Sequence, residues 1–137
     1  MFGAFDISAS ALNAQRVRLE TIESNLANWN SPESTHSTDG KPIPYRRLFP
    51  VFQAQRMANG GIGVAVKSIE EDSSPFFEKN EPWNTHLADA NGNVKYPNVD
   101  LATESVNALE TTRAYEANIT AIETTKSMMN ATLRVLA

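Results

Sequence analysis

The chain has 137 residues, 41% of them apolar, no cysteine and a formal net charge of −4. This length suits one domain with a modest core, and the acidic balance argues against general nucleic-acid binding. Lack of cysteine excludes disulfides, zinc–thiolate sites and cysteine nucleophiles. The first residues lack the basic and apolar regions of a cleaved secretion signal, and no run of about 18 apolar residues predicts insertion into a membrane.

A long amphipathic helix is predicted over residues 6–28, where Asp6 or Ser8 can cap the first free N–H groups. Its buried stripe advances by alternating steps of three and four residues, which is the spacing of a coiled-coil seam. The stripe comprises Phe5, Ser8, Leu12, Gln15, Leu19, Ile22, Leu26 and Trp29.

Residues 30–44 differ in composition from this helix. They are polar and include three prolines and one glycine. Such a segment buries little apolar surface, so an exposed loop or linker is predicted.

Residues 45–97 are predicted to form a small β-rich insert. The β-formers of residues 48–54 are interrupted by Pro50, which favours an edge strand, and a turn at residues 59–61 leads into a second strand at 63–70. Asn91-Gly92 lies between the short apolar runs 87–89 and 94–96, a pattern typical of a β-hairpin.

The C-terminal segment 98–136 contains no Pro or Gly and predicts a second long helix, capped by Asn98 or Asp100. As one helix it would span about 55 Å, too long to lie across a compact domain of this size. Its heptad-like seam consists of Tyr115, Ile119, Ile122, Lys126, Met129, Leu133 and Leu136. Upstream, another phase runs through Val99, Ala102, Val106 and Leu109, so the stripe shifts near Arg113.

Matching seams at the two chain ends predict a mainly α-helical fold in which the terminal helices pair as an antiparallel coiled coil around a small β insert. Residues 1–29 and 98–137 would form the helical assembly domain, 30–44 a linker and 45–97 the insert. The alternative is two amphipathic helices packed on a central core. Asn25, Asn28, Arg113 and Asn118 lie near the seams, where polar side chains can fix register and partner or simply face solvent.

Candidate chemical sites are sparse. His36 and His86 stand apart in the sequence, without the convergent ligands that a metal or general-base site needs. Asp89, Asn91, Asn93 and Asp100 resemble part of a calcium loop, but Gly92 is misplaced for that motif and Asx turns explain these residues better.

Other charged or patterned groups also have simpler explanations. Residues 70–72 form an acidic strand end that can guard an edge. Arg46-Arg47 could stack on a base, but the acidic balance favours a surface or interface role. Asn118 and Asn130 begin glycosylation sequons within the predicted helix rather than in a loop. We therefore predict no enzymatic activity, cofactor, metal or small-molecule substrate.

Both ends of the chain carry a family resemblance. Ser24-Asn25-Leu26-Ala27-Asn28, at the end of the first helix, resembles the signature of the bacterial flagellar rod, hook and hook-associated axial proteins. The C-terminal pattern is similar to that of the short proximal-rod members. It comprises Asn98, Val99, Asp100, Leu101, Glu104, Val106, Asn107, the run from Arg113 through Tyr115 to Asn118, and the run from Thr125 to Met129.

The resemblance implies a structural subunit of the basal-body rod, polymerising through its terminal helices to build the shaft that transmits motor torque. It implies contacts with further copies, other rod proteins and the adaptor joining the rod to the membrane ring. The location would be the rod in the periplasmic space, reached by flagellar type III export without a cleaved signal. The alternative is a coiled-coil adaptor with a β insert. The residues expected to carry assembly are Leu12, Leu19, Ile22, Ser24, Asn25, Leu26, Ala27, Asn28, Asn98, Val99, Asp100, Val106, Arg113, Tyr115, Asn118, Ile119, Ile122, Met129 and Leu133.

Overall fold

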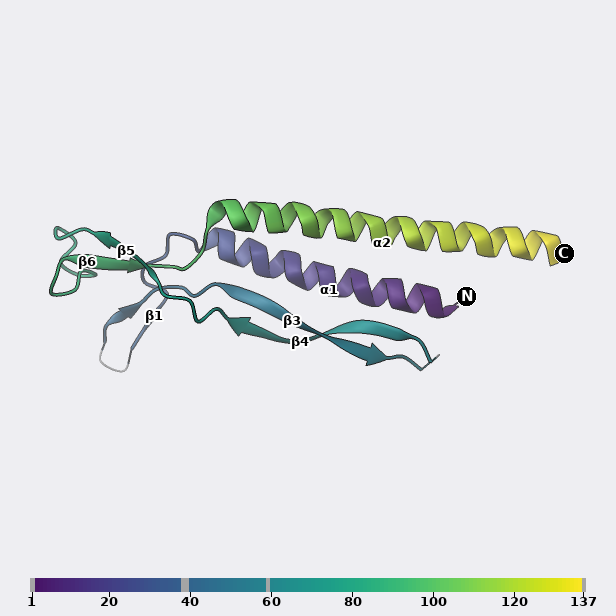
Figure 1. The fold of residues 1–137 in the computed structure, drawn as a ribbon, viewed down its shortest axis with the longest axis horizontal. Helices are drawn as coiled ribbons and strands as arrows, with labels where there is room; N and C mark the ends of the chain where they lie inside the picture. Colours follow the sequence, from purple (N-terminus) through teal and green to yellow (C-terminus); the bar gives the residue numbers. More distant parts are fainter. Residues whose placement is uncertain (1, 38–39, 59, 137) are drawn as a thin grey trace. The chain divides into compact units, whose positions relative to one another are not determined.

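The computed structural model describes residues 2–37, 40–58 and 60–136. Along the chain, one long helix precedes the strands and a second long helix follows them (Figure 1). The elements are α1 (Phe2–Ala27), β1 (Thr35–His36), β2 (Pro42–Ile43), β3 (Leu48–Arg56), β4 (Ile62–Glu71), β5 (Phe77–Asn80), β6 (Asn93–Tyr96) and α2 (Leu101–Leu136). This confirms the prediction of two long terminal helices with a β-containing middle, whose described residues form three two-stranded sheets.

The chain forms two compact units. Unit 1 comprises Met1–Glu20, Pro50–Ile69 and Asn107–Ala137, and unit 2 comprises Thr21–Phe49 and Glu70–Val106. Among the described residues, the buried side chains of unit 1 are small ones, Ala14 and Thr111. Unit 2 buries Ile22, Val94 and Val99 together with the polar Thr21, Asn25, Asn98 and Glu104. Polar groups are therefore a large part of the interior of unit 2.

A close backbone approach packs β4 against α1 within unit 1. The Ser10 hydroxyl donates to the carbonyl of Ile7 at 2.7 Å and accepts the N–H of Val64 at 3.1 Å. A Cβ atom at the adjacent Gly63 would lie 2.6 Å from Ser10 Oγ and 2.2 Å from Met57 Cε. A side chain at this position would have to displace the Ser10 hydroxyl and the end of the Met57 side chain, so glycine permits the close approach.

Helix α2 begins at Leu101, three residues later than the predicted start. Asp100 is its N-cap, because its carboxylate accepts the N–H of Thr103 at 3.1 Å as well as the Thr103 hydroxyl. These bonds, led by that of the hydroxyl, lower the pKa of the Asp100 carboxyl. The alternative cap, Asn98, bonds elsewhere in unit 2.

The predicted hairpin around Asn91-Gly92 is wrong in its strand partner. The turn exists: Gly92 adopts a φ of 80°, and the Asp89 carboxylate accepts the N–H groups of Asn91 at 2.8 Å and Asn93 at 2.9 Å. However, β6 pairs antiparallel with β5, with Phe77 opposite Tyr96 and Glu78 opposite Lys95, while residues 87–89 lie in the turn region. Asp89 fixes the turn through Asx bonding and leaves the preceding run out of the sheet.

The polar segment 30–44 contains a small sheet that its composition did not predict. Thr35 lies opposite Ile43 and His36 opposite Pro42 in antiparallel register. Ser37 donates its N–H to the carbonyl of Lys41 at 2.8 Å, and Gly40 adopts a φ of 73°. Glycine reaches this left-handed conformation without steric cost, which permits the tight reversal.

The predicted stripe of α1 is mostly shielded, since its residues from Phe5 to Leu26 are half-buried or buried. Helix α2 differs. Tyr115, Ile122 and Met129 are half-buried, whereas Ile119 is 38% exposed and Leu133 is 58% exposed. The shielded positions beside the heptad residues belong to Asn118 and Thr125, so polar and small residues line much of the less exposed face of α2.

The close approach at Gly63 yields a test. Gly63→Ala should destabilise the packing of β4 on α1, with a loss of about 1–3 kcal/mol in the free energy of unfolding because the new methyl meets Ser10 and Met57. Hydrogen exchange at the Val64 amide reports this contact directly and should accelerate. Adding Met57→Ala should restore part of the loss; unchanged exchange in Gly63→Ala would contradict the assigned packing.

Candidate functional site

The side chain of Asn25 is fully buried in unit 2, where all of its hydrogen-bonding capacity is used. Its Nδ2 donates to the carbonyl of Leu48 at 2.8 Å and to Glu104 Oε2 at 3.1 Å. Its Oδ1 accepts the Leu48 N–H at 2.9 Å and the Tyr45 hydroxyl at 3.0 Å. One amide therefore joins the end of α1, the start of β3 and the first turn of α2. An amide has two donors and two main acceptor sites, and no other side chain of this size meets that demand.

Glu104 is the buried acid of the same cluster, with an exposed fraction of 0%. Its Oε1 accepts Arg47 Nε at 2.7 Å while its Oε2 accepts Asn25. A buried carboxylate is costly unless it is paired and hydrogen-bonded, and these two contacts supply both conditions. Arg47 also lies 3.5 Å from Asp72 Oδ2, so it bridges two carboxylates.

Asn98 and Arg46 extend the cluster to the segment after β4. Asn98 accepts the Arg47 N–H at 2.9 Å and donates to the carbonyls of Asp72 and Ser74 at 3.1 and 3.2 Å. Arg46 donates to the Asp72 carbonyl at 2.9 Å and lies over the Phe76 ring, 4.3 Å from its centroid. Hydrogen bonds from Ser74, then the charge of Arg47, lower the pKa of the Asp72 carboxyl.

Ser24 and Asn28, the other polar residues of the signature at residues 24–28, form hydrogen bonds at the C-terminal end of α1. The Ser24 hydroxyl lies 3.1 Å from the Tyr45 hydroxyl. The backbone and side-chain N–H groups of Asn28 both donate to the Ser24 carbonyl, at 3.1 and 2.9 Å. The signature therefore has an internal structural role: Asn25 enters the cluster, and Ser24 and Asn28 satisfy groups around it.

The two histidines converge on one carboxylate. His36 Nε2 lies 2.8 Å and His86 Nε2 lies 3.6 Å from Glu33 Oε1. Despite this proximity, in the part of the chain that the structure describes, no group of three or more His, Asp or Glu side chains is arranged to hold a metal ion. Neither helix, over its described residues, is long and apolar enough to cross a membrane.

The structure divides the residues expected to carry assembly between the cluster and the surface. Asn25 and Asn98 meet in the cluster, and Ser24 and Asn28 lie beside it. Ile22 and Val99 are buried. Half-buried positions are Leu12, Leu19, Leu26, Tyr115, Asn118, Ile122 and Met129, and exposed ones are Ala27, Asp100, Val106, Arg113, Ile119 and Leu133.

Comparison with known proteins matches both ends of the chain. The family model "Flagella basal body rod protein" matches residues 5–32, and "Flagellar basal body rod FlgEFG protein C-terminal" matches residues 90–135. The chain is 46% identical over 134 residues to the flagellar basal-body rod protein FlgC of Salmonella typhimurium, covering 97% of this chain and 96% of that protein. The chain belongs to the FlgC family of flagellar basal-body rod proteins.

More distant members align over a similar share of their length. Identity is 37% over 147 residues with FlgC of Bacillus subtilis, covering 98% of this chain and 97% of that protein. It is 34% over 153 residues with FlgC of Borreliella burgdorferi, covering 99% and 97%. The chain is thus a structural subunit of the flagellar basal-body rod and not an enzyme.

Four members of the cluster are not among the site residues expected from the sequence: Tyr45, Arg47, Asp72 and Glu104. Tyr45 and Arg47 stood in a segment considered for base stacking, and Asp72 in an acidic strand end. Glu104 belongs to the C-terminal family pattern, but the sequence does not predict that it is buried. Glu104 lies on the same face of α2 as the buried Thr111, seven residues on, but the sequence alone does not show that this face is buried. Its partner Arg47 lies 57 residues away, which no local pattern reveals.

Asn25→Asp tests the cluster with a nearly isosteric change. It replaces an N–H donor, 3.1 Å from Glu104 Oε2, with a second carboxylate oxygen. We expect a loss of about 3 kcal/mol or more in the free energy of unfolding at neutral pH, measured by urea titration. In the folded variant the two carboxylates would share a proton, which raises their apparent pKa. The folded state then binds more protons than the unfolded state. The loss of stability therefore shrinks as pH falls from about 8 to about 5.

Asn118→Asp is the matched control. The Asn118 amide donates to the Ala114 carbonyl within α2. The Asn118→Asp variant should lose less than about 1 kcal/mol in the free energy of unfolding, and this loss should change little between about pH 8 and about pH 5. Equal losses at Asn25 and Asn118, or a pH-independent loss at Asn25, would contradict the assigned cluster.

Proposed function

We propose that the chain polymerises in the rod through its terminal helices, which pair in antiparallel fashion within one subunit and stack against those of neighbouring subunits. One contact in each unit supports the pairing. Arg18 lies 4.0 Å from Glu110 in unit 1, and Asn25 lies 3.1 Å from Glu104 in unit 2. Residue numbers rise along α1 while those of the partners on α2 fall, the order expected of antiparallel helices.

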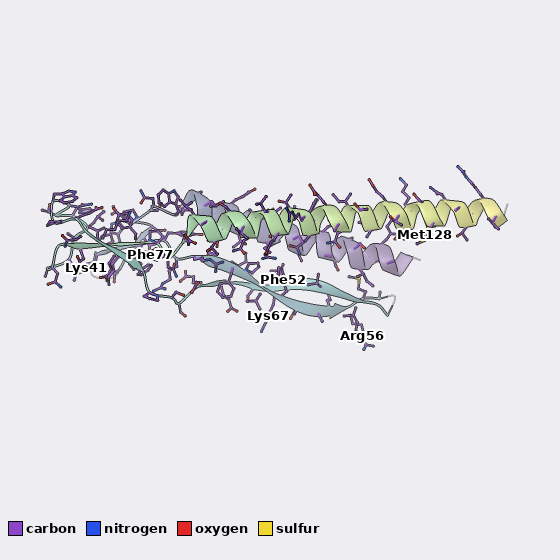
Figure 2. All side chains as sticks on the ribbon, turned by 45° about the horizontal axis from the view of Figure 1, so that its top comes forward. Lys41, Phe52, Arg56, Lys67, Phe77 and Met128 are labelled. Carbon is purple, nitrogen blue, oxygen red and sulfur yellow. The ribbon has the colours of Figure 1, made fainter. Side chains whose placement is uncertain are left out.

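The exposure of apolar residues on α2 is the main support for stacking between subunits. Beyond Thr111, none of the described residues 112–135 is buried. Ile119, Met128 and Leu133 are 38%, 57% and 58% exposed, and Met128 is labelled on α2 in Figure 2. A helix gains most of its stability from packing an apolar face, so this part of α2 lacks the contacts that would stabilise it alone. Neighbouring subunits would supply them.

The apolar residues of α2 also point in more than one direction. Met128 and Val135 are seven residues apart and share one face, whereas Ile122 and Met129 lie more than a quarter-turn away from them. The second face is half-buried within the chain. A helix that is apolar on several sides is usually buried in a larger structure. This arrangement fits a subunit whose helix contacts its own chain and at least one neighbour.

The finer parts of the proposal rest on the family. Residues 1–29 and 98–137 form the assembly domain, while the linker 30–44 and insert 45–97 contact outer neighbours. The partners are further copies, other rod proteins and the adaptor joining the rod to the membrane ring. The subunit reaches the periplasmic rod by type III export without a cleaved signal. It transmits torque through many lateral helix contacts.

Charge placed on the exposed apolar side chains tests this function. Ile119→Asp and Leu133→Asp should leave the helix content of the purified chain nearly unchanged, because both side chains are exposed in the single subunit. In cells they should abolish rod formation and swimming, because each would bury an unpaired charge between subunits. Helix content follows from circular dichroism, and rods from electron microscopy of isolated basal bodies.

Asn130→Asp is the control, since it adds the same charge at an exposed polar position of the same helix. It should support swimming. Normal swimming in both apolar variants would count against the stacking, and so would an equal defect in the control. Retention of the unaltered chain in the cytoplasm of swimming cells would favour the adaptor alternative.

A further inference from the structure

Met57 lies in unit 1, where the turn between β3 and β4 meets helix α1. The turn fixes its backbone: the Met57 N–H donates to the Gly61 carbonyl at 2.8 Å, and the Met57 carbonyl accepts the Gly60 N–H at 3.0 Å. The methyl carbon of Met57 and the Ser10 hydroxyl both lie beside Gly63, 2.2 and 2.6 Å from the point that a Cβ atom there would occupy. The end of the Met57 side chain therefore lies at the contact between β4 and α1.

The polar groups at this contact are already engaged with each other. The Ser10 hydroxyl donates its one hydrogen to the Ile7 carbonyl at 2.7 Å, and its oxygen accepts the Val64 N–H at 3.1 Å. A thioether sulfur is only a weak acceptor, so Met57 makes little demand on either hydrogen. A strong acceptor in the same place would compete for one of them.

A cavity open to solvent borders Met57, which is half-buried. Its volume is about 460 Å³. A water molecule occupies about 30 Å³ in the liquid, and hydrogen peroxide has only one further oxygen atom, so peroxide can enter. The cavity is lined by Asp6 and Ala9 of α1 and by Gln55, Arg56, Met57 and Ala58, of which Arg56 is labelled in Figure 2.

We propose that Met57 is an oxidation site, and that its conversion to the sulfoxide loosens the β3–β4 hairpin from α1. Hydrogen peroxide is the oxidant. A sulfur lone pair attacks one peroxide oxygen and forms the S–O bond while the O–O bond breaks. The proton on the transferred oxygen passes to the departing hydroxide, which leaves as water. The sulfur loses two electrons and the peroxide gains them.

The loosening follows from the change in the chemistry of the side chain. Oxidation turns a flexible apolar group into a polar one with a strong acceptor oxygen. Beside Ser10, this oxygen draws either the hydroxyl hydrogen away from Ile7 or the Val64 N–H away from Ser10. It also adds an atom where Gly63 leaves little room. Methionine sulfoxide reductases restore the thioether, so the change is reversible.

This inference concerns the single subunit and does not depend on the proposed assembly. Peroxide treatment of the purified full chain, followed by amide hydrogen exchange, tests it. Mass spectrometry of proteolytic peptides should show one added oxygen on Met57. The Val64 amide should then exchange about three- to tenfold faster, the effect of losing one hydrogen bond. Treatment with a methionine sulfoxide reductase should restore slow exchange.

Met57→Leu is the matched control, because leucine conserves the apolar volume and has no sulfur to oxidise. Its Val64 amide should exchange slowly before and after peroxide, although Met128, which is 57% exposed, becomes oxidised. Met128→Leu should respond to peroxide as the unaltered chain does.

Three results would overturn the proposal. The first is no oxygen on Met57 under conditions that oxidise Met128. The second is unchanged exchange at Val64 once Met57 is oxidised. The third is equal acceleration at Val64 in peroxide-treated Met57→Leu, which would assign the effect to another methionine.

Discussion

The carboxylate of Glu104 is the constraint around which unit 2 is built. A fully buried charge of this kind is tolerated only with partners, and they come from the end of α1 through Asn25 and from the start of β3 through Arg47. Removing Arg47 leaves a buried charge unpaired, and removing Asn25 leaves one buried carboxylate oxygen without its donor. The three segments are therefore held in one arrangement more strictly than apolar packing alone would require. Asn98 and Asp72 extend the same network to the entry of α2. The family signature at residues 24–28 thereby acquires a physical role inside the subunit.

Beyond this network the character of the chain changes. Past Thr111, α2 offers half-buried small and polar residues on one side and exposed apolar residues elsewhere. Seven of its Ser and Thr hydroxyls donate to the carbonyl four residues earlier, from Ser105 to Thr132. Such bonds satisfy the hydroxyl but slightly weaken a helix. The cluster around Glu104 is held by many hydrogen bonds, whereas α2 beyond Thr111 has few stabilising contacts within the chain. This suits a subunit that completes its packing only in an assembly.

The sequence predicts the long helices well because neither contains Pro and apolar residues recur along both at steps of three and four. Residue type offers Asn98 or Asp100 as the cap of α2, and the structure shows Asp100. The turn at Asn91-Gly92 follows from its dipeptide. The strand partner of β6 cannot be predicted from the sequence, because the local pattern favours residues 87–89 and does not show that β5 pairs with β6 instead. The cluster is harder still: Asn25 and Glu104 are 79 residues apart, and each alone is compatible with a solvated helix face. Apolar periodicity does not assign Thr125 to the shielded face of α2, because it counts apolar residues, whereas this face also accepts small and polar ones.

Amide hydrogen exchange on the purified chain at low concentration tests the central claim most directly. The Leu48 amide, bonded to Asn25 Oδ1, and the amides of α2 from Glu104 to Thr111 should exchange slowly, because the cluster holds them. Residues 115–135 should exchange much faster in the lone subunit, since their stabilising neighbours are absent. Uniform strong protection along α2 would show that the arm is stable by itself, and fast exchange at Leu48 would show that the cluster does not organise the unit.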